Sequence, residues 1–327
     1  IGLWFLNTHI QIPDGRENAA NYIYQFSVIS LCVSVITIPY NADVISHERM
    51  SYYAIVTIIE AILKLAFAYA LFLFGFDKLI LYGGLMMIVN IIDFLMYYAY
   101  CRKLFFETKY KLIFDRQLFL KIFSFSGWTI IGQLSVVGAN QGTSILINMF
   151  HSLLANAGIG ISQQVNNAVA SLTANFQTAF QPQLTKSYAE KDYNYMNNLI
   201  CKTSKISFFL LYLASLPIII NIDFILTIWL GDSVPTYTNQ FCILFLVASL
   251  FNAISSPLWM SVYATGRIKN YQIAVSTIFL SDIIIVYFIF RNFNTSPVIA
   301  MVVKTMVNMI IVFIRVLFAT KEVPGFS

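Results

Sequence analysis

The chain has 327 residues, of which 58% are hydrophobic and only 11% are charged. A soluble domain normally carries about 25% charged residues, so this composition excludes an ordinary soluble protein and indicates a lipid environment. The net charge is +5, but the basic residues lie between apolar runs, which makes them topology signals rather than a nucleic-acid-binding surface.

The predicted elements are membrane-spanning helices, because apolar runs of about 20 residues, the length that crosses a bilayer, recur along the chain. The first six residues are apolar but too short to span, and we expect them to be the end of a helix cut before residue 1, so that the chain is a fragment. The sequence then predicts an all-α, polytopic protein with nine complete spans. These are residues 19–41, 52–74, 79–101, 122–150, 155–184, 205–229, 238–264, 271–291 and 297–319.

Basic residues gather on one side of this alternating arrangement. The two longest connections, 102–121 and 185–204, are basic, and the same side receives Arg49, Arg267, Lys269, Arg315 and Lys321. The opposite side has only Arg16, Lys78 and Arg291. Since basic loops stay in the cytoplasm, we expect a cytoplasmic C-terminus.

The fourth and fifth predicted spans are unusually polar. Gln133, Asn140, Ser144 and Asn148 follow one helical face of the fourth span, and Gln163, Asn167, Gln177 and Gln181 follow one face of the fifth. A polar stripe facing lipid is costly, so each should face protein or water. Two interpretations remain open: tight helix packing through small and polar residues, and a solvated cavity lined by these amides.

Ionisable residues inside the first predicted spans are candidates for function. Glu60 and Lys64 are four residues apart on one helix, and Asp93 lies at a similar depth, ~12 Å from the cytoplasmic end of the next span. Lys64 could reach both carboxylates. The group either neutralises itself to permit insertion or forms an ion-coupling or head-group site.

Two further charges lie on the last predicted spans. Asp282 and Lys304 are ~14 Å and ~10 Å from the outer end, where they can pair across the helices, or Lys304 can extend toward the surface. Asp282 therefore joins Glu60 and Asp93 as an ion-coupling candidate.

Catalytic and cofactor signals are missing from the sequence. The four cysteines have no metal-ligand spacing, and we find no P-loop, nucleophile elbow or glycine-rich dinucleotide motif. The outer connections are short and hold no plausible catalytic set. We therefore expect no metal, no cofactor and no enzymatic activity. Because a nucleotide site is also missing, any work that the protein does in the membrane should be driven by an ion gradient, the membrane potential or substrate supply.

Short motifs in a fixed order carry a family resemblance. They are IPYNA at 38–42 with HERM at 47–50, FQPQLTKSYA at 180–189, WLG at 229–231 and ATGRIK at 264–269. In this order the chain resembles the polysaccharide flippases of the multidrug/oligosaccharidyl-lipid/polysaccharide superfamily, most closely the lipopolysaccharide or O-antigen exporters of Bacteroides-type bacteria.

The resemblance implies a MATE-like fold in which two six-helix lobes face each other across a cavity. The nine spans would be helices four to twelve, with residues 1–101 in the first lobe, 102–121 as a cytoplasmic linker and 122–327 in the second lobe. It implies residence in the bacterial inner membrane, with other polysaccharide assembly proteins as candidate partners.

The implied substrate is an oligosaccharide on polyprenyl diphosphate, flipped to the periplasmic leaflet. We therefore predict a substrate path comprising Asn140, Ser144, Asn148, Gln163, Asn167, Gln177, Lys64 and Lys304. The amides suit sugar hydroxyls, and the two lysines suit phosphate. A MATE-type drug or cation antiporter is the alternative, and a membrane-embedded polysaccharide-processing enzyme is a more distant one.

Overall fold

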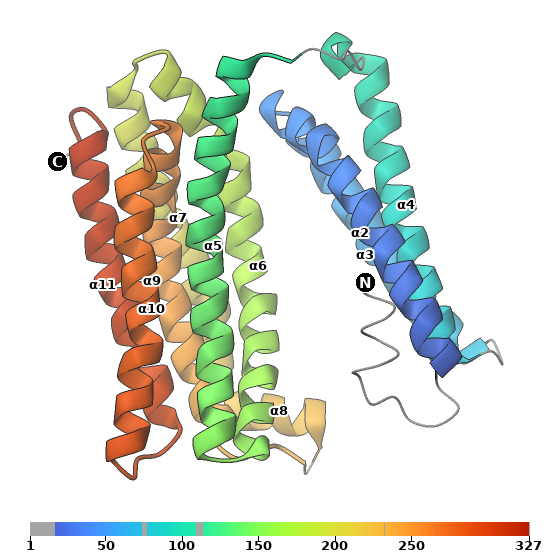
Figure 1. The fold of residues 1–327 in the computed structure, drawn as a ribbon, viewed down its shortest axis with the longest axis vertical. Coiled ribbons are helices and arrows are strands. Elements are labelled where there is room, and N and C mark those ends of the chain that lie inside the picture. The colour runs from blue at the N-terminus through green and yellow to red at the C-terminus, as the bar shows by residue number, and fades with distance from the viewer. Residues whose placement is uncertain (1–16, 74–76, 109–113, 232, 327) are drawn as a thin grey trace. The chain divides into compact units, whose positions relative to one another are not determined.

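The computed structural model describes residues 17–73, 77–108, 114–231 and 233–326, and Figure 1 shows their arrangement. Within them the chain is helical, and it divides into two compact units, residues 1–113 and 114–327. The boundary lies inside the 102–121 segment expected to link two lobes. The partial helix expected at residues 1–6 lies outside the described residues.

The first unit is built from three long helices, α2 (Glu17–Ser46), α3 (Met50–Leu73) and α4 (Lys78–Leu104), followed by the short 3-10 helix η1 (Phe106–Thr108). Helix α4 begins at Asp77, whose carboxylate accepts from the Leu79 N–H at 2.9 Å and so satisfies a free donor of the first turn. Helix α2 packs mainly on α4, and α3 packs on both. Most of the apolar surface of these helices faces outward, since only 6% of the most apolar window of each is buried.

The second unit is a helical bundle with α9 at its centre. Its helices are α5 (Arg116–Phe150), α6 (Leu153–Ala189), α7 (Tyr193–Ile220), α8 (Ile222–Leu230), α9 (Thr238–Ala264), α10 (Lys269–Asn292) and α11 (Val298–Glu322). Helix α9 packs against α6, α7 and α11, and 56% of its most apolar window is buried. The side chains of Asp115, Ser152 and Asp192 cap the N-termini of α5, α6 and α7.

Length and composition identify the membrane spans. Among the described residues, eight helices are long and apolar enough to cross a bilayer: α2, α3, α4, α5, α7, α9, α10 and α11. Helix α6 is also long, at 37 residues, but it is not one of the eight. Its amides explain this, because Gln163, Gln164, Asn166 and Asn167 follow one another within two turns. The all-α, polytopic membrane architecture predicted from the sequence is confirmed.

The prediction of one continuous helix over residues 205–229 was wrong. The structure divides this segment into α7 and the short α8, with Asn221 between them. The side chain of Asn221 donates to the Pro217 carbonyl at 3.0 Å, the same carbonyl that its backbone N–H contacts at 3.2 Å. Asparagine competes in this way with helix propagation, and Pro217 removes one donor from the same turn.

Helix α8 lies across the end of the second bundle instead of continuing along it (Figure 1). Phe224, Ile228 and Trp229 are exposed on it, and Asn239 at the start of α9 donates to the Asp223 carboxylate and so ties the two helices together. A short apolar helix with an exposed tryptophan is typical of the membrane–water interface.

The predicted long connection 185–204 is mostly helical. Helix α6 continues to Ala189 and α7 begins at Tyr193, so the turn between them is only residues 190–192. In Figure 1 this turn lies at the same end of the second unit as the start of α5, the α9–α10 turn and the end of α11. The basic residues Lys121, Lys186, Lys191, Arg267, Lys269 and Lys321 belong to these ends. Which membrane face this end occupies stays a prediction.

Candidate functional site

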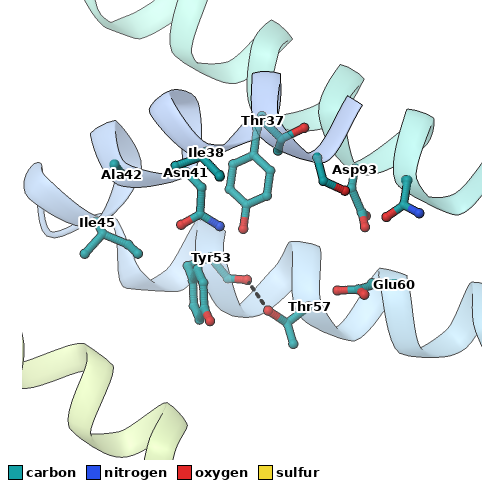
Figure 2. Close-up of a pocket in the computed structure, with 12 residues that line it drawn as sticks. Thr37, Ile38, Asn41, Ala42, Ile45, Tyr53, Thr57, Glu60 and Asp93 are labelled. Atoms are coloured by element: carbon teal, nitrogen blue, oxygen red, sulfur yellow. Dashed lines mark hydrogen bonds between the residues drawn. The ribbon is translucent and has the colours of Figure 1, made fainter. Parts of the chain in front are cut away.

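An acid-lined cavity lies within the first unit, between α2, α3 and α4 (Figure 2). Its volume is about 440 Å³, within the ordinary range of ligand pockets. Glu60 comes from α3 and Asp93 from α4, so two of the three predicted ion-coupling residues share one cavity. Figure 2 shows both carboxylates at one end of the space, with Ala42 and Ile45 of α2 at the other.

Three further polar side chains of the cavity direct a donor to the backbone of their own helix. The hydroxyls of Thr37 and Thr57 donate to carbonyls of their own helices, Val33 at 2.8 Å and Tyr53 at 3.0 Å. The Asn90 amide likewise donates to Met86 at 3.2 Å. Each of these side chains keeps an oxygen that can accept. Two carboxylates together with such oxygens make a site suited to a cation or to a cationic part of a solute.

Glu60 and Asp93 differ in their partners. Lys64 lies one turn from Glu60 on the same helix, and its ammonium is 2.5 Å from Glu60 Oε1. Asp93 Oδ1 is buried and has no hydrogen-bond partner. From the sequence, Lys64 could reach both carboxylates. The hydrogen bond that it forms is to Glu60, and Lys64 is not among the residues that line the cavity. Its part in a substrate path stays a prediction.

Aromatic rings pack the first unit near the ends of α2 and α4, beyond Ile45. Tyr52 stacks on Tyr100 with a centroid distance of 3.6 Å and donates to the Met96 carbonyl at 2.8 Å. His47 stacks on Phe105 at 4.0 Å. These contacts join α2, α3 and α4 around the buried side chains of Val44, Val56 and Cys101. A rigid aromatic layer therefore holds the three helices that carry the cavity residues.

The second unit contains a separate charged cluster. Lys304 of α11 donates to Oδ1 of Asn140 on α5, and its ammonium lies 5.1 Å from the centre of the Phe245 ring on α9. Asp282 of α10 is only 1% exposed, and its Oδ1 has no hydrogen-bond partner. Lys304 is thus held by an amide and an aromatic face. The structure brings together Lys304 and Asn140, two of the predicted path residues.

The other predicted path residues divide into two groups. Asn148 and Asn167 are exposed, and Gln163 is half-buried. Ser144 donates to Asn156 Oδ1 at 2.5 Å, and Gln177 is 6% exposed and donates to the Ala253 carbonyl of α9 at 3.2 Å. The stripe on α6 is therefore mixed, because its middle is open while Gln177 is used in packing.

A buried polar network that the sequence did not suggest lies nearer the basic end of this unit. Arg315 of α11 was expected on the cytoplasmic surface, but it is 9% exposed. It donates to Asn252 and Ser255 of α9 and to Tyr271 of α10. Gln272 of α10 is also buried and donates to the Tyr263 hydroxyl. The only signal for this network in the sequence was the helical spacing of three polar residues, Asn252, Ser255 and Ser256, within an otherwise apolar stretch.

Comparison with solved structures identifies the fold. The chain is similar to a MATE crystallised in complex with MaL6, with a TM-score of 0.77 and 12% identity over 99% of this chain and 74% of that one. It is also similar to a multidrug resistance MATE family transporter of the MOP superfamily in an outward-facing conformation, with a TM-score of 0.75, 13% identity and the same coverage. A MATE in complex with MaD3S gives a TM-score of 0.73 at 12% identity, over 96% of this chain and 71% of that one.

The sequence matches no protein-family model and no curated protein. Fold and hydropathy together define the class of this protein: it is a multi-pass helical membrane protein with a MATE-like fold. At such low identity the comparison establishes the fold alone, and any function has to be argued from the residues described above.

Proposed function

We propose that this chain is a transporter that flips a polyprenyl-diphosphate-linked oligosaccharide across the bacterial inner membrane by alternating access. The MATE-like fold supports a transporter rather than an enzyme, since its solved neighbours include a multidrug transporter. The ordered sequence motifs resemble those of polysaccharide flippases. Membrane lipids are its surroundings, and other polysaccharide assembly proteins are candidate partners.

The observation that carries the proposal is the polarity of α6. This helix is as long as a membrane span, yet Gln164, Asn167, Asn175 and Gln181 are exposed along it. Exposed amides in a bundle of membrane helices require water or a polar solute opposite them. Amides both donate and accept, as do sugar hydroxyls, so a carbohydrate head group matches these side chains better than an apolar drug does.

A charged group is available for the diphosphate. The Lys304 ammonium already lies beside Asn140, at the α5 stripe, and phosphate transferred from water needs such a cation to offset its lost hydration. The polyprenyl tail can stay in the bilayer while the sugar passes the amides. On this proposal Asn140, Ser144, Asn148, Gln163 and Asn167 contact sugar, and Lys304 attracts phosphate.

The test is a flipping assay in proteoliposomes loaded with a polyprenyl-diphosphate oligosaccharide. Flipping is measured as the fraction of the sugar that an added glycosidase reaches from outside. We expect the unmodified protein to accelerate this step and Asn167→Leu to slow it at least tenfold, since a lost hydrogen bond to sugar is not replaced. The matched control is Leu172→Ala, an exposed apolar residue of the same helix. Equal rates with and without protein would reject the proposal.

The cavity of the first unit favours a second candidate, a cation-coupled antiporter of the MATE type. Glu60 and Asp93 provide two carboxylates in one space, which suits a coupling ion or a cationic drug. The same proteoliposomes distinguish the two. An antiporter exports a cationic dye in exchange for Na⁺ or protons, and Asp93→Asn should abolish this export. In that case the lipid-linked sugar stays in its original leaflet.

A further inference from the structure

A groove on the second unit lies at the basic end of α5, against the turn between α9 and α10. Its volume is about 730 Å³ and most of its lining is apolar. Leu120, Phe125 and Trp128 contribute from α5, and Ile268 contributes from the turn. The described residues on both sides belong to the second unit, so the groove does not depend on any other part of the chain.

Three cations border this apolar groove: Lys121 from α5, with Arg267 and Lys269 from the turn. All three are exposed, and the residues that line the groove include no carboxylate to neutralise them. The Lys269 ammonium lies 5.3 Å from the centre of the Trp128 ring, which fixes it against the apolar surface. Positive charge at the rim of an apolar groove is complementary to an amphipathic anion, whose charged group can contact the rim while its apolar part lies in the groove.

The turn itself holds the cations in place. Gly266 adopts φ +72°, a left-handed conformation that favours glycine, and the Arg267 N–H donates to Thr265 Oγ1 at 3.1 Å. Ile268, at 2% exposure, anchors the turn between the two charged residues. The cations therefore belong to a defined turn rather than to a flexible basic tail.

We propose that this groove is a binding site for one anionic membrane phospholipid, such as phosphatidylglycerol. Its phosphate contacts Lys121, Arg267 and Lys269, and its acyl chains lie on Phe125 and Trp128. Basic pockets between membrane helices bind anionic head groups in this way, and each nearby Lys or Arg adds attraction. A lipid-linked oligosaccharide fits less well, because the lining has one hydroxyl, Ser124, and no side-chain amide for a sugar.

The test uses Trp128 as the reporter. The sequence has four tryptophans, so Trp4→Phe, Trp229→Phe and Trp259→Phe leave Trp128 alone. This protein is titrated in detergent micelles with phosphatidylglycerol or phosphatidylcholine carrying brominated acyl chains, which quench a nearby indole. We expect phosphatidylglycerol to quench at roughly a hundredfold lower mole fraction, about fivefold for each cation. Equal quenching by the two lipids would overturn the proposal.

Matched variants separate a site from general charge attraction. Lys121→Gln, Arg267→Gln and Lys269→Gln together should abolish the preference for phosphatidylglycerol. The control variant loses the same amount of charge from exposed positions outside the groove, through Lys186→Gln, Lys191→Gln and Lys202→Gln. This variant should keep the preference for phosphatidylglycerol. Lys269→Gln alone should weaken binding about fivefold, which tests the site even if the triple variant folds poorly. The reverse pattern in the two triple variants would disprove the site.

The occupant is tested by competition. Unlabelled phosphatidylglycerol should restore the Trp128 fluorescence, and an equal amount of polyprenyl diphosphate should not restore more. Displacement by polyprenyl diphosphate at a much lower concentration would overturn the phospholipid assignment. The outcome is independent of the flipping assay, because this titration measures occupancy without transport.

Discussion

Arg315 on α11 donates a 2.8 Å hydrogen bond from Nη1 to Oδ1 of Asn252 on α9. The same nitrogen donates to Ser255 Oγ at 2.7 Å, and Nε donates to the Tyr271 hydroxyl on α10 at 3.3 Å. A buried guanidinium thus fastens three helices through neutral partners, and it is a structural centre of the second bundle.

We expect Arg315→Ala to lower the free energy of unfolding by about 2 kcal/mol or more, because the charged hydrogen bonds that join α11 to α9 and α10 are lost. Thermal unfolding in detergent, followed by the loss of the monodisperse chromatographic peak, measures this. Arg267→Ala removes the same side chain from an exposed position and should change stability by less than about 0.5 kcal/mol. Similar melting of the two variants would show that the network does not stabilise the fold.

Arg315 also shows what the sequence could and could not predict. Apolar runs near 20 residues located the spans, since the bilayer sets their length. The sequence did not indicate how deeply Arg315 is buried in the bundle. Helices α6, α7 and α11 continue beyond their apolar runs, so the bundle extends past the predicted ends of the spans. A residue near the predicted end of a span therefore lies inside a bundle, where packing partners on other helices determine its role.

The candidate cavity was partly predictable for a related reason. Glu60 and Asp93 are conspicuous because charges are rare inside spans, and the structure places them in one cavity. Thr37, Asn41 and Thr57 line the same cavity but blend into apolar runs, so only the packing of three helices identifies them. The break at Asn221 was missed because the sequence is strongly apolar on both sides of it, so Asn221 and Asp223 did not by themselves indicate the end of a helix.

Gly132 provides a test of helix packing between α5 and α10. A Cβ at this position would lie 2.2 Å from Oε1 of Gln272, whose amide also donates to Tyr263. Gly132→Ala should therefore displace Gln272 and destabilise the protein by about 1–3 kcal/mol in thermal unfolding. In a protein that already carries Gln272→Ala, the change Gly132→Ala should destabilise much less, because the side chain that it displaces is gone. A double-mutant cycle of the two changes measures this difference.

The control for this prediction is Gly138→Ala on the same helix, where a Cβ meets nothing within 4 Å. This change should be neutral or stabilising by up to about 1 kcal/mol, because alanine favours a helix more than glycine does. Equal loss at positions 132 and 138 would mean that α5 and α10 do not approach as described.

The Lys64–Glu60 pair makes a prediction about insertion. Lys64→Ala leaves Glu60 without its 2.5 Å partner inside a span, so we expect a lower yield of membrane-inserted protein. Glu60→Gln in the same chain should restore much of that yield, because the unpaired charge is gone. Asp93→Asn in the Lys64→Ala background should restore less, since the hydrogen bond of Lys64 is to Glu60. Full yield of Lys64→Ala by itself would remove the role assigned to this pair.

Membrane orientation is tested at the two ends of the second bundle. Single cysteines at Ser233 and Thr236, in a protein without its native cysteines, should react in intact cells with a thiol reagent that cannot cross the membrane. Cysteines at Glu190 and Lys191 should react only after the cells are opened, because the basic end is expected in the cytoplasm. All four positions belong to turns between helices, so accessibility reports sidedness rather than burial. The opposite pattern would reverse the predicted direction of transport.

The last prediction concerns the polar faces of α5 and α6. If they border an aqueous path in one state of an alternating-access cycle, cysteines at Asn140, Gln163 and Asn167 should react with a small hydrophilic thiol reagent. Ile145 and Leu172 are exposed apolar residues of the same helices. We expect their apolar side chains to contact lipid, so cysteines at these positions should react slowly.

Gln177 separates a path from packing on α6. Gln177→Leu removes the donor to the Ala253 carbonyl and should lower stability by about 1 kcal/mol, while Asn167→Leu should leave the melting temperature nearly unchanged and slow transport instead. If α6 serves only for packing, labelling at Asn167 is as slow as at Leu172, and Asn167→Leu acts through folding or not at all. That result would leave the MATE-like fold intact and reject the sugar path, because the exposed amides of α6 are the observation on which the path depends.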